Sequence, residues 1–283
     1  MPTFATPEPI SVELDVIHAD IRLTAGPGTE TTVDVAPADD SAGAIQDAQD
    51  TEVRFNGRTL EITQPRPKRK LFTDIYRRGG IVLTIVLPTG STLSGKGGLV
   101  TMKAAGQLGE FRMRTGAGLL DLDETGPVFV DSASSQISVR HAMGQVDVNA
   151  ANGAVWFGTI DGPGAIKSVN GTVGVGEALD SLEIRGVSGN VTIDHARTDL
   201  KASTINGSVR VGEVCQGAVV LDTAAGSIDV GIKQGTAAWL DAKAMMGSVR
   251  NGLNGSDSKP EGAENTVQLR ARTQVGSIDV HRA

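Results

Sequence analysis

The chain has 283 residues, of which 36 are glycine and only 3% are aromatic, which excludes an aromatic-rich core and disfavours long helices. Apolar residues make up 39% of the chain, which suffices for a buried core and excludes wholesale disorder. The net charge of −7 argues against nucleic acid as a partner, because that binding depends on neutralising phosphates. The one cysteine, Cys215, permits no internal disulfide and no cysteine-based zinc site, and we expect a small buried thiol.

Residues 1–9 are expected to be a disordered N-terminus. They contain neither the basic stretch nor the apolar stretch of a secretory signal. The longest apolar run, residues 81–87, is too short to cross a bilayer. A cytoplasmic protein is therefore the expectation.

Residues 10–97 show alternating apolar residues with irregular spacing, as in Val12, Leu14 and Val16. The pair Asn56-Gly57 stands between two short runs and predicts a hairpin turn. Residues 36–50 are polar and rich in Asp and Ala, and we expect a loop there. This part is predicted to form an N-terminal β cap or irregular first coils, because a solenoid needs an atypical end to close its core.

A basic insertion at residues 64–78 interrupts this region. Its apolar residues have helical spacing, so a short amphipathic turn could bind anionic lipid head groups or an acidic partner. A solvated loop whose apolar residues plug the end of the core is the alternative. The candidate binding residues are Arg66, Lys68, Arg69, Lys70, Arg77 and Arg78.

From residue 98 onward the sequence repeats about every nine residues. A small residue, usually glycine, marks each repeat, and the second and fourth residues after it are almost always apolar, as in Val173 and Val175 after Gly171. Apolar residues two apart predict strands with one buried face, and glycine allows the turn between them. The repeat thus predicts a strand of about five residues followed by a corner.

The sequence also shows a longer period of 18 residues, which is twice the first. Val169, Val187 and Ile205 each stand two residues before a marker glycine, and the intervening repeats lack a bulky residue there. Two nine-residue repeats therefore make one coil, and residues 98–283 are predicted to form a regular β-solenoid with a loop insertion at 251–265. We expect the last strand, 276–280, to lie uncovered at the end, with its charged neighbours favouring monomers or small oligomers over filaments.

The chemistry-bearing residues do not form a recognisable catalytic or metal motif. Nonapeptide repeats invite comparison with calcium-binding β-rolls, but arginine occupies positions where such a site needs carboxylates, so neither a metal nor a cofactor is expected. A carbohydrate-active β-helix enzyme is the enzymatic alternative. It would use outward acids, which in the 18-residue register do not cluster: Asp121, Asp147, Glu183, Asp229 and Asp279.

The two tryptophans are assigned opposite faces by this register. Trp156 points outward beside a buried Phe157 and could anchor a partner, although covering a neighbouring side chain is the simpler role. Trp239 is expected on an inward position.

The run 82–88 and the units Gly207 to Val211 and Gly226 to Val230 resemble a large bacterial family of β-strand-repeat proteins of unknown function, also described as "putative adhesins". The likeness extends from about residue 10 to 280. It implies a single-stranded right-handed β-solenoid without catalytic residues, and some relatives are linked to envelope-stress responses. We expect a non-enzymatic scaffold or interaction module whose partner is another protein or a second copy; the carbohydrate-active enzyme and the membrane-surface binder stay open as alternatives.

Overall fold

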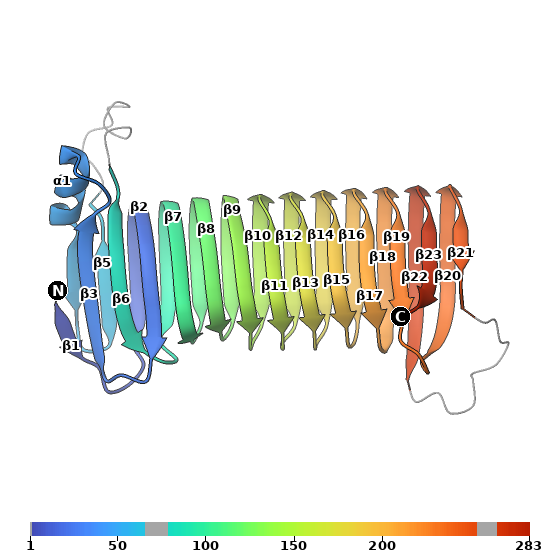
Figure 1. The fold of residues 1–283 in the computed structure, drawn as a ribbon, viewed down its shortest axis with the longest axis horizontal. Coiled ribbons are helices and arrows are strands. Elements are labelled where there is room, and N and C mark those ends of the chain that lie inside the picture. The colour runs from blue at the N-terminus through green and yellow to red at the C-terminus, as the bar shows by residue number, and fades with distance from the viewer. Residues whose placement is uncertain (1, 66–78, 254–264) are drawn as a thin grey trace. The chain divides into compact units, whose positions relative to one another are not determined.

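The computed structural model describes residues 2–65, 79–253 and 265–283, and these contain 23 β-strands and one α-helix (Figure 1). The chain forms two compact units, Met1–Arg140 and His141–Ala283. Within each unit most strands run parallel to their neighbours, one coil stacked on the next. The predicted all-β solenoid is confirmed.

The first unit begins with three strands, one helix and two further short strands. A strand of eight residues and three longer strands follow, and the last of them ends two residues into the second unit. The elements are β1 (Thr3–Ala5), β2 (Ser11–Gly26), β3 (Glu30–Pro37), α1 (Ala42–Asp50), β4 (Glu52–Phe55), β5 (Thr59–Thr63), β6 (Ile81–Pro88), β7 (Thr92–Leu108), β8 (Phe111–Thr125) and β9 (Val128–Ala142).

The first coil in the sequence is not the outermost coil in space. β2 pairs in parallel with β7 on one side, and with β5 and then β6 on the other. Val12 thus lies between Leu60 and Leu93, and all three side chains are buried. Residues 10–97, expected to form a cap or irregular first coils, therefore contain a full coil that lies between two others.

Antiparallel strands cover the outer coil of the first unit. β3 pairs with β6, β1 with β3, and β4 with β5, so the parallel pattern stops there. The predicted hairpin at Asn56-Gly57 is present as the β4–β5 turn, in which Gly57 has a φ of 90°. The prediction of a disordered N-terminus is wrong for β1, because β1 is held by hydrogen bonding to β3.

The predicted loop over residues 36–50 is also wrong, because helix α1 occupies most of it. Ser41 caps the helix: its hydroxyl accepts a hydrogen bond from the Ala44 backbone N–H at 3.1 Å. The helix packs on β3 and β6, and Ala44 is fully buried. Polar composition therefore concealed a short capped helix in which Ala44 and Asp47 are buried.

The second unit consists of short strands in pairs, each pair forming one coil. They are β10 (Val146–Asn152), β11 (Val155–Ile160), β12 (Gly164–Asn170), β13 (Val173–Ala178), β14 (Leu182–Ser188), β15 (Val191–Ala196), β16 (Leu200–Asn206), β17 (Val209–Val214), β18 (Gly217–Ala225), β19 (Ile228–Ile232), β20 (Ala237–Met246), β21 (Val249–Asn251), β22 (Thr266–Val275) and β23 (Ile278–Arg282).

The 18-residue coil predicted from the sequence is confirmed by the strand register. Val155 pairs with Val173, Val173 with Val191, and Val191 with Val209, each 18 residues on. These four side chains are almost fully buried and form one column of the core. Burying such apolar columns is the main force that holds the coils together.

Glycine is required at the stacked corners because successive backbones meet there. A Cβ atom at Gly189 would lie 2.1 Å from the carbonyl oxygen of Gly171, and one at Gly207 would lie equally close to that of Gly189. Both glycines also have φ values, 143° and 151°, that L side chains rarely adopt. These repeat positions therefore require glycine for two reasons, the close contact between successive backbones and the positive φ.

Buried threonines secure the same corners, a feature that the apolar pattern did not reveal. The hydroxyl of Thr223 donates to the carbonyl oxygen of Gly207 at 2.8 Å, and that of Thr273 to Gly226 at 2.9 Å. Both side chains face inward and are almost fully buried. Each hydroxyl satisfies its own hydrogen-bonding need while bracing a glycine turn.

The last coils do not stack in chain order. β22 lies between β18 and β20, and β23 between β19 and β21, so the coil β20–β21 is the outermost of the second unit (Figure 1). The expectation of an uncovered last strand is wrong, because β23 is paired along both edges. Of the predicted insertion 251–265, residues 254–264 lie outside the described part of the chain.

The prediction for Trp239 is wrong as well, since 74% of this residue is exposed. Ala237 is buried at the corner, and the next inward positions are Ala238 and Leu240, of which Leu240 stands beside the buried Leu269. Two successive inward residues shift the alternation by one position. Counting from the marker glycine therefore assigned Trp239 to the opposite face.

Candidate interaction surfaces

The basic residues predicted to bind an anionic surface lie outside the residues that the structure describes. They are Arg66, Lys68, Arg69, Lys70, Arg77 and Arg78, and their role stays a prediction. Gln64, just before them, is buried. Its Oε1 accepts hydrogen bonds from the backbone N–H groups of Ile17 at 2.7 Å and His18 at 3.3 Å. The segment is therefore preceded by an anchored residue.

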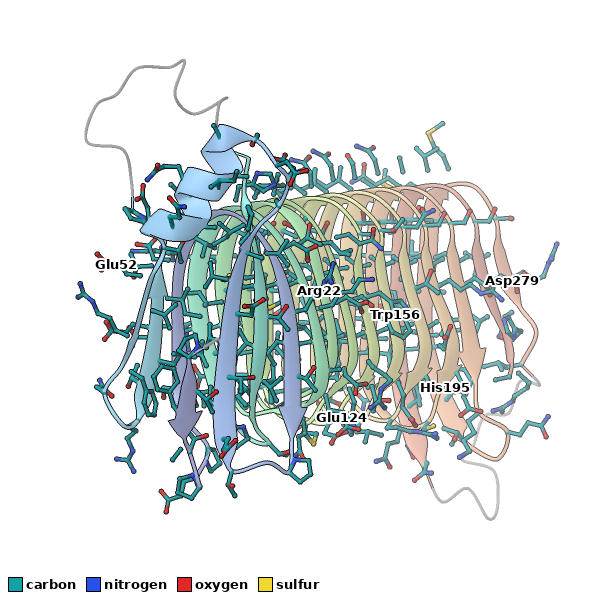
Figure 2. All side chains as sticks on the ribbon, turned by 60° about the vertical axis from the view of Figure 1, so that its left-hand side comes forward. Arg22, Glu52, Glu124, Trp156, His195 and Asp279 are labelled. Carbon is teal, nitrogen blue, oxygen red and sulfur yellow. The ribbon has the colours of Figure 1, made fainter. Side chains whose placement is uncertain are left out.

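Trp156 points outward from β11, as its register predicts, and is 47% exposed (Figure 2). Its ring extends toward the neighbouring strand, because a Cβ atom at Gly174 would lie only 3.0 Å from the indole Cδ1. Gly174 thus makes room for one edge of the ring, while the remainder stays accessible. An anchoring role for this half-covered ring stays a prediction.

A cluster of polar side chains links β13, β15 and β17 on the outside of the second unit. Glu177, His195 and Glu213 stand in register on these strands. Arg197 binds two of the carboxylates: its Nε donates to Glu177 Oε1 at 2.7 Å, and its Nη1 lies 3.7 Å from Glu213 Oε1. Sequence reasoning missed the cluster, although its three register positions are 18 residues apart.

Cys215 also belongs to this cluster. Arg197 Nη1 donates to the Cys215 Sγ at 3.4 Å, and the thiol donates to Glu213 Oε1 at 3.5 Å. The hydrogen bond to Glu177, followed by that to Cys215, raises the pKa of the Arg197 guanidinium. As predicted, Cys215 is a buried thiol. The cluster consequently joins strands through a permanently charged arginine.

An open hollow of about 680 Å³ lies beside the cluster. Its lining includes His195 and Glu213 from the cluster, together with Thr192, Asp194 and Arg210. His195 Nδ1 is 3.7 Å from Glu213 Oε1, which is longer than a hydrogen bond. The hollow therefore presents separate cationic and anionic groups on a shallow surface.

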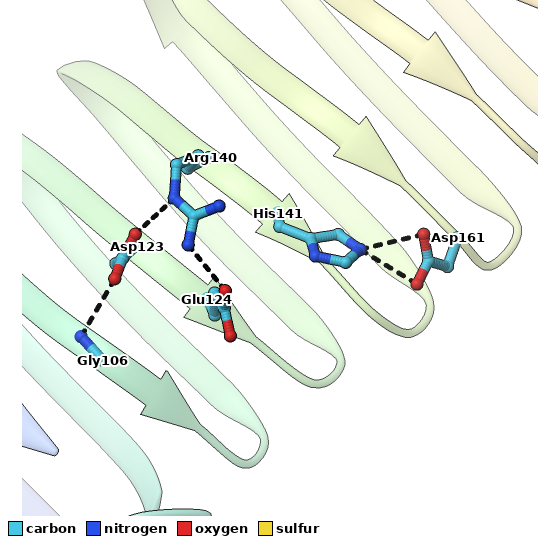
Figure 3. A network of polar contacts seen from close by, with 6 residues as sticks. All are labelled: Gly106, Asp123, Glu124, Arg140, His141 and Asp161. Carbon is cyan, nitrogen blue, oxygen red and sulfur yellow. Dashed lines mark hydrogen bonds and ion pairs between the residues drawn. The ribbon is translucent and has the colours of Figure 1, made fainter. Parts of the chain in front are cut away.

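A second network of charged groups lies in the first unit and joins β7, β8 and β9 (Figure 3). Arg140 donates from Nε to Asp123 and from Nη2 to Glu124, the latter at 2.6 Å. Asp123 also accepts from the Gly106 backbone N–H at 3.1 Å. The hydrogen bond from Arg140 is the main cause that lowers the pKa of Asp123. In the second unit, His141 Nε2 contacts Asp161 at 2.9 Å.

Three of the five outward acids form ion pairs with cations. Glu183 contacts Arg185 at 2.7 Å and Lys201 at 3.0 Å, and the hydrogen bond from Arg185 is the first cause that lowers its pKa. Asp229 contacts His281 at 3.0 Å, and Asp279 contacts Arg250 at 3.3 Å. The other two, Asp121 and Asp147, lie on separate coils, in β8 and β10.

A row of exposed aliphatic side chains runs along one corner of the second unit. Val169, Val187 and Ile205 occupy corresponding positions near the ends of β12, β14 and β16, and 46%, 39% and 51% of these residues are exposed. The register makes them neighbours on adjacent strands. The 18-residue spacing in the sequence revealed the coil but did not show that these residues face solvent. We call these three residues the apolar row.

Residues 10–281 match the family model described as Toastrack DUF4097. The chain belongs to the Toastrack DUF4097 family. The match covers both units and agrees with the extent of the resemblance seen in the sequence. The recognition of an uncharacterised bacterial β-strand-repeat family is therefore confirmed.

Three solved bacterial structures match this Toastrack chain over most of its length but share little of its sequence. A "putative adhesin" from Parabacteroides merdae ATCC 43184 has 13% identity and a TM-score of 0.49, over 81% of this chain and 94% of that one. A "putative adhesin" from Bacteroides fragilis NCTC 9343 has 13% identity and a TM-score of 0.38, over 99% and 95%. A "putative cell adhesion protein" from Clostridium sporogenes ATCC 15579 has 11% identity and a TM-score of 0.20, over 100% and 98%.

No curated protein matches the chain significantly. In the described part of the chain, no three His, Cys, Asp or Glu side chains lie close enough together to hold a metal ion. No helix among residues 2–65, 79–253 and 265–283 has the length and apolar character needed to span a bilayer.

Proposed function

We propose that this Toastrack protein is a non-enzymatic scaffold that binds another protein through the apolar row of its second unit. The supporting observation is the regular exposure of Val169, Val187 and Ile205 on three consecutive coils. Scattered exposed aliphatic residues are common on protein surfaces, whereas adjacent ones in a line mark contact sites. The row is held by paired strands, so binding would not require it to become ordered first.

The spacing of the row favours an amphipathic helix as the partner element. Neighbouring strands in a sheet are about 4.8 Å apart, which sets the spacing of successive side chains in the row. Residues three and four apart on a helix rise by about 4.5 and 6 Å. An extended strand would present same-face side chains about 6.7 Å apart, which fits this spacing less well. A helix lying along the solenoid axis would therefore match all three side chains.

The contacts of the acids and of the thiol favour binding over catalysis. A general acid in a carbohydrate-active enzyme needs a raised pKa, whereas the ion pairs of Glu183 and Asp123 lower theirs. Cys215 is buried, which leaves it poorly accessible to an external substrate. The absence of catalysis is thus part of this proposal, as are a cytoplasmic location and a role in an envelope-stress or regulatory assembly.

Site-specific photocrosslinking in the native cell tests the proposal. A photoreactive phenylalanine analogue replaces Val187 in one strain and the exposed Lys201 of β16 in a control strain. We expect one adduct of discrete mass from position 187 and none from position 201, because the partner would cover only the row.

Flanking substitutions test whether the row acts as a unit. Val169→Asp and Ile205→Asp together should abolish the adduct at position 187, because they place charges beneath the bound helix. Both side chains are exposed, so the melting temperature should change little. An equal yield at positions 187 and 201, or an adduct that survives the two aspartates, would refute the proposal.

A further inference from the structure

The outermost coil of the second unit, β20 and β21, has one unpaired edge. β20 pairs with β22, and β21 with β23; among the described residues, no strand pairs with the opposite edge of either. β20 has ten residues, which is long for an edge strand, and unpaired N–H and C=O groups along such an edge can bind a further strand.

The side chains of this coil are also exposed in an unusual way. Leu240 and Ala242 are partly exposed, although their partners on β22, Leu269 and Ala271, are buried. Trp239 and Met245 on the outer face are each 74% exposed, and Met246 at the end of the strand is 69% exposed. An open coil end with three large exposed apolar side chains is a surface that favours association.

The sequence of β20 is complementary to itself in the antiparallel direction. If two copies pair about a twofold axis through Ala242, Asp241 of each copy stands opposite Lys243 of the other. In the same pairing, Trp239 stands opposite Met245, and the inward Leu240 opposite Ala244. Opposite charges and methionine–aromatic pairs both stabilise such cross-strand neighbours.

The neighbouring registers are less favourable, and this selects one arrangement. Moving the axis to Asp241 would place the two aspartates opposite each other, and moving it to Lys243 would do the same to the two lysines. Like charges directly opposite each other are destabilising. A twofold pairing uses the same edge on both copies and closes after two chains, so it yields a dimer and no filament.

We propose that β20 is the interface of a homodimer, in which it pairs antiparallel with β20 of a second copy about a twofold axis at Ala242. The proposal is independent of the apolar row, which lies on other residues. It gives the open coil an occupant whose charges and apolar side chains match it.

Charge exchange tests the proposal in the full chain by sedimentation equilibrium. The parent protein should dimerise at concentrations below about 100 µM. Asp241→Lys or Lys243→Asp alone should raise the Kd at least roughly tenfold, because each creates two like-charged pairs. The double variant, with the charges exchanged, should return the Kd to within about threefold of the parent.

The matched control addresses the ion pair that Asp241 makes with Arg272 at 3.3 Å. Asp222 is the register partner of Arg272 on its other side, within a covered coil. Asp222→Lys should leave the Kd unchanged, which separates the interface from general effects of charge.

Cysteine crosslinking tests the position of the axis. In a Cys215→Ser background, Ala242→Cys should form a disulfide-linked dimer under mild oxidation, because residues on the axis face their own copies at a suitable distance. Ala244→Cys should not, since Leu240 would stand opposite it. A parent that stays monomeric at about 100 µM, a double variant as weak as the single ones, or equal crosslinking at 242 and 244 would overturn the proposal.

Discussion

The outer coils of the two units differ in how they end. In both units, a strand near one end of the chain lies one coil in from the outermost coil. β2 lies between β7 and the pair β5–β6, and β22 lies between β18 and β20. This leaves a different coil outermost in each unit. Both β2 and β22 are thereby held by strand pairing along both edges, which protects them from fraying.

Among the described residues, covering elements lie against the outer coil of the first unit but not against that of the second. The antiparallel strands β1, β3 and β4 and the helix α1 cover the first unit, and Phe4 of β1 contacts Phe55 of β4 with ring centroids 4.8 Å apart. β1 and β4 are three and four residues long, which leaves little edge for another strand. The outer coil of the second unit instead presents the long edge of β20. The outer coil of the first unit is thus closed to further strands, whereas the edge of β20 in the second unit is available for association.

The largest difference between the two outer coils is expected for their leucines. Leu60 on β5 is fully buried, so Leu60→Ala should lower the free energy of unfolding by about 3 kcal/mol. Leu240 on β20 is partly exposed, and Leu240→Ala should cost only about 1 kcal/mol in the monomer. Urea unfolding followed by far-UV circular dichroism measures both. Equal losses would mean that the two coils are equally covered.

Capping of helix α1 provides a smaller test of the same difference. Ser41→Ala should cost about 1 kcal/mol, because the Ala44 N–H loses its acceptor at the start of the helix that covers the first unit. Ser248→Ala in the outer coil of the second unit removes only an exposed hydroxyl contact of 3.4 Å and should change stability by less than about 0.5 kcal/mol. The same unfolding measurement separates the two. A larger effect at Ser248 would contradict the assignment of the covered end.

The smallest expected effect is a pH dependence of stability in the coil β22–β23, which lies one coil in from the end of the second unit. His281 donates to the Arg282 carbonyl and contacts Asp229 on β19, and these contacts, the first foremost, raise its pKa. Its contribution to stability is therefore fully present below the unfolded-state pKa and is lost as pH rises through the folded-state pKa. Because both side chains are nearly half exposed, we expect about 0.5 kcal/mol at most.

His281→Gln should remove this dependence, so that the stability difference from the parent is larger at pH 5.5 than at pH 8.5. The corresponding coil of the first unit offers a contrast, because Lys96 contacts Asp15 of β2 at 3.1 Å without involving a histidine. Lys96→Gln should therefore show no comparable change between the two pH values. A difference at His281 that grows with rising pH would contradict the assigned direction.

Sequence reasoning succeeded where a pattern repeats and failed where the chain departs from it. The columns of valine and the 18-residue coil follow from apolar residues two apart, and the outward position of Trp156 follows from the same count. Helix α1 was missed because residues 36–50 show polar composition without a helical apolar stripe. Trp239 was misplaced because one additional inward residue at a corner reverses every later position in the strand.

The order of the coils could not be read from the sequence. Each coil offers its neighbours the same apolar columns and the same glycine corners, so β18 matches β20 and β22 about equally well by pattern. The polar cluster was similarly hidden, because Glu177, His195 and Glu213 are ordinary outward residues until the register brings them together. Which coils and side chains become neighbours is thus set by the packing of the whole unit.

Disulfide trapping tests the coil order most directly, since both the open coil and its unpaired edge depend on it. In a Cys215→Ser background, Asp222→Cys with Arg272→Cys places two thiols on adjacent strands, and Asp222→Cys with Lys243→Cys places them two strands apart, about 9.6 Å. We expect rapid intramolecular crosslinking of the first pair and none of the second. Crosslinking of the second pair in place of the first would show that the coils stack in chain order and would contradict the position of β22 between β18 and β20.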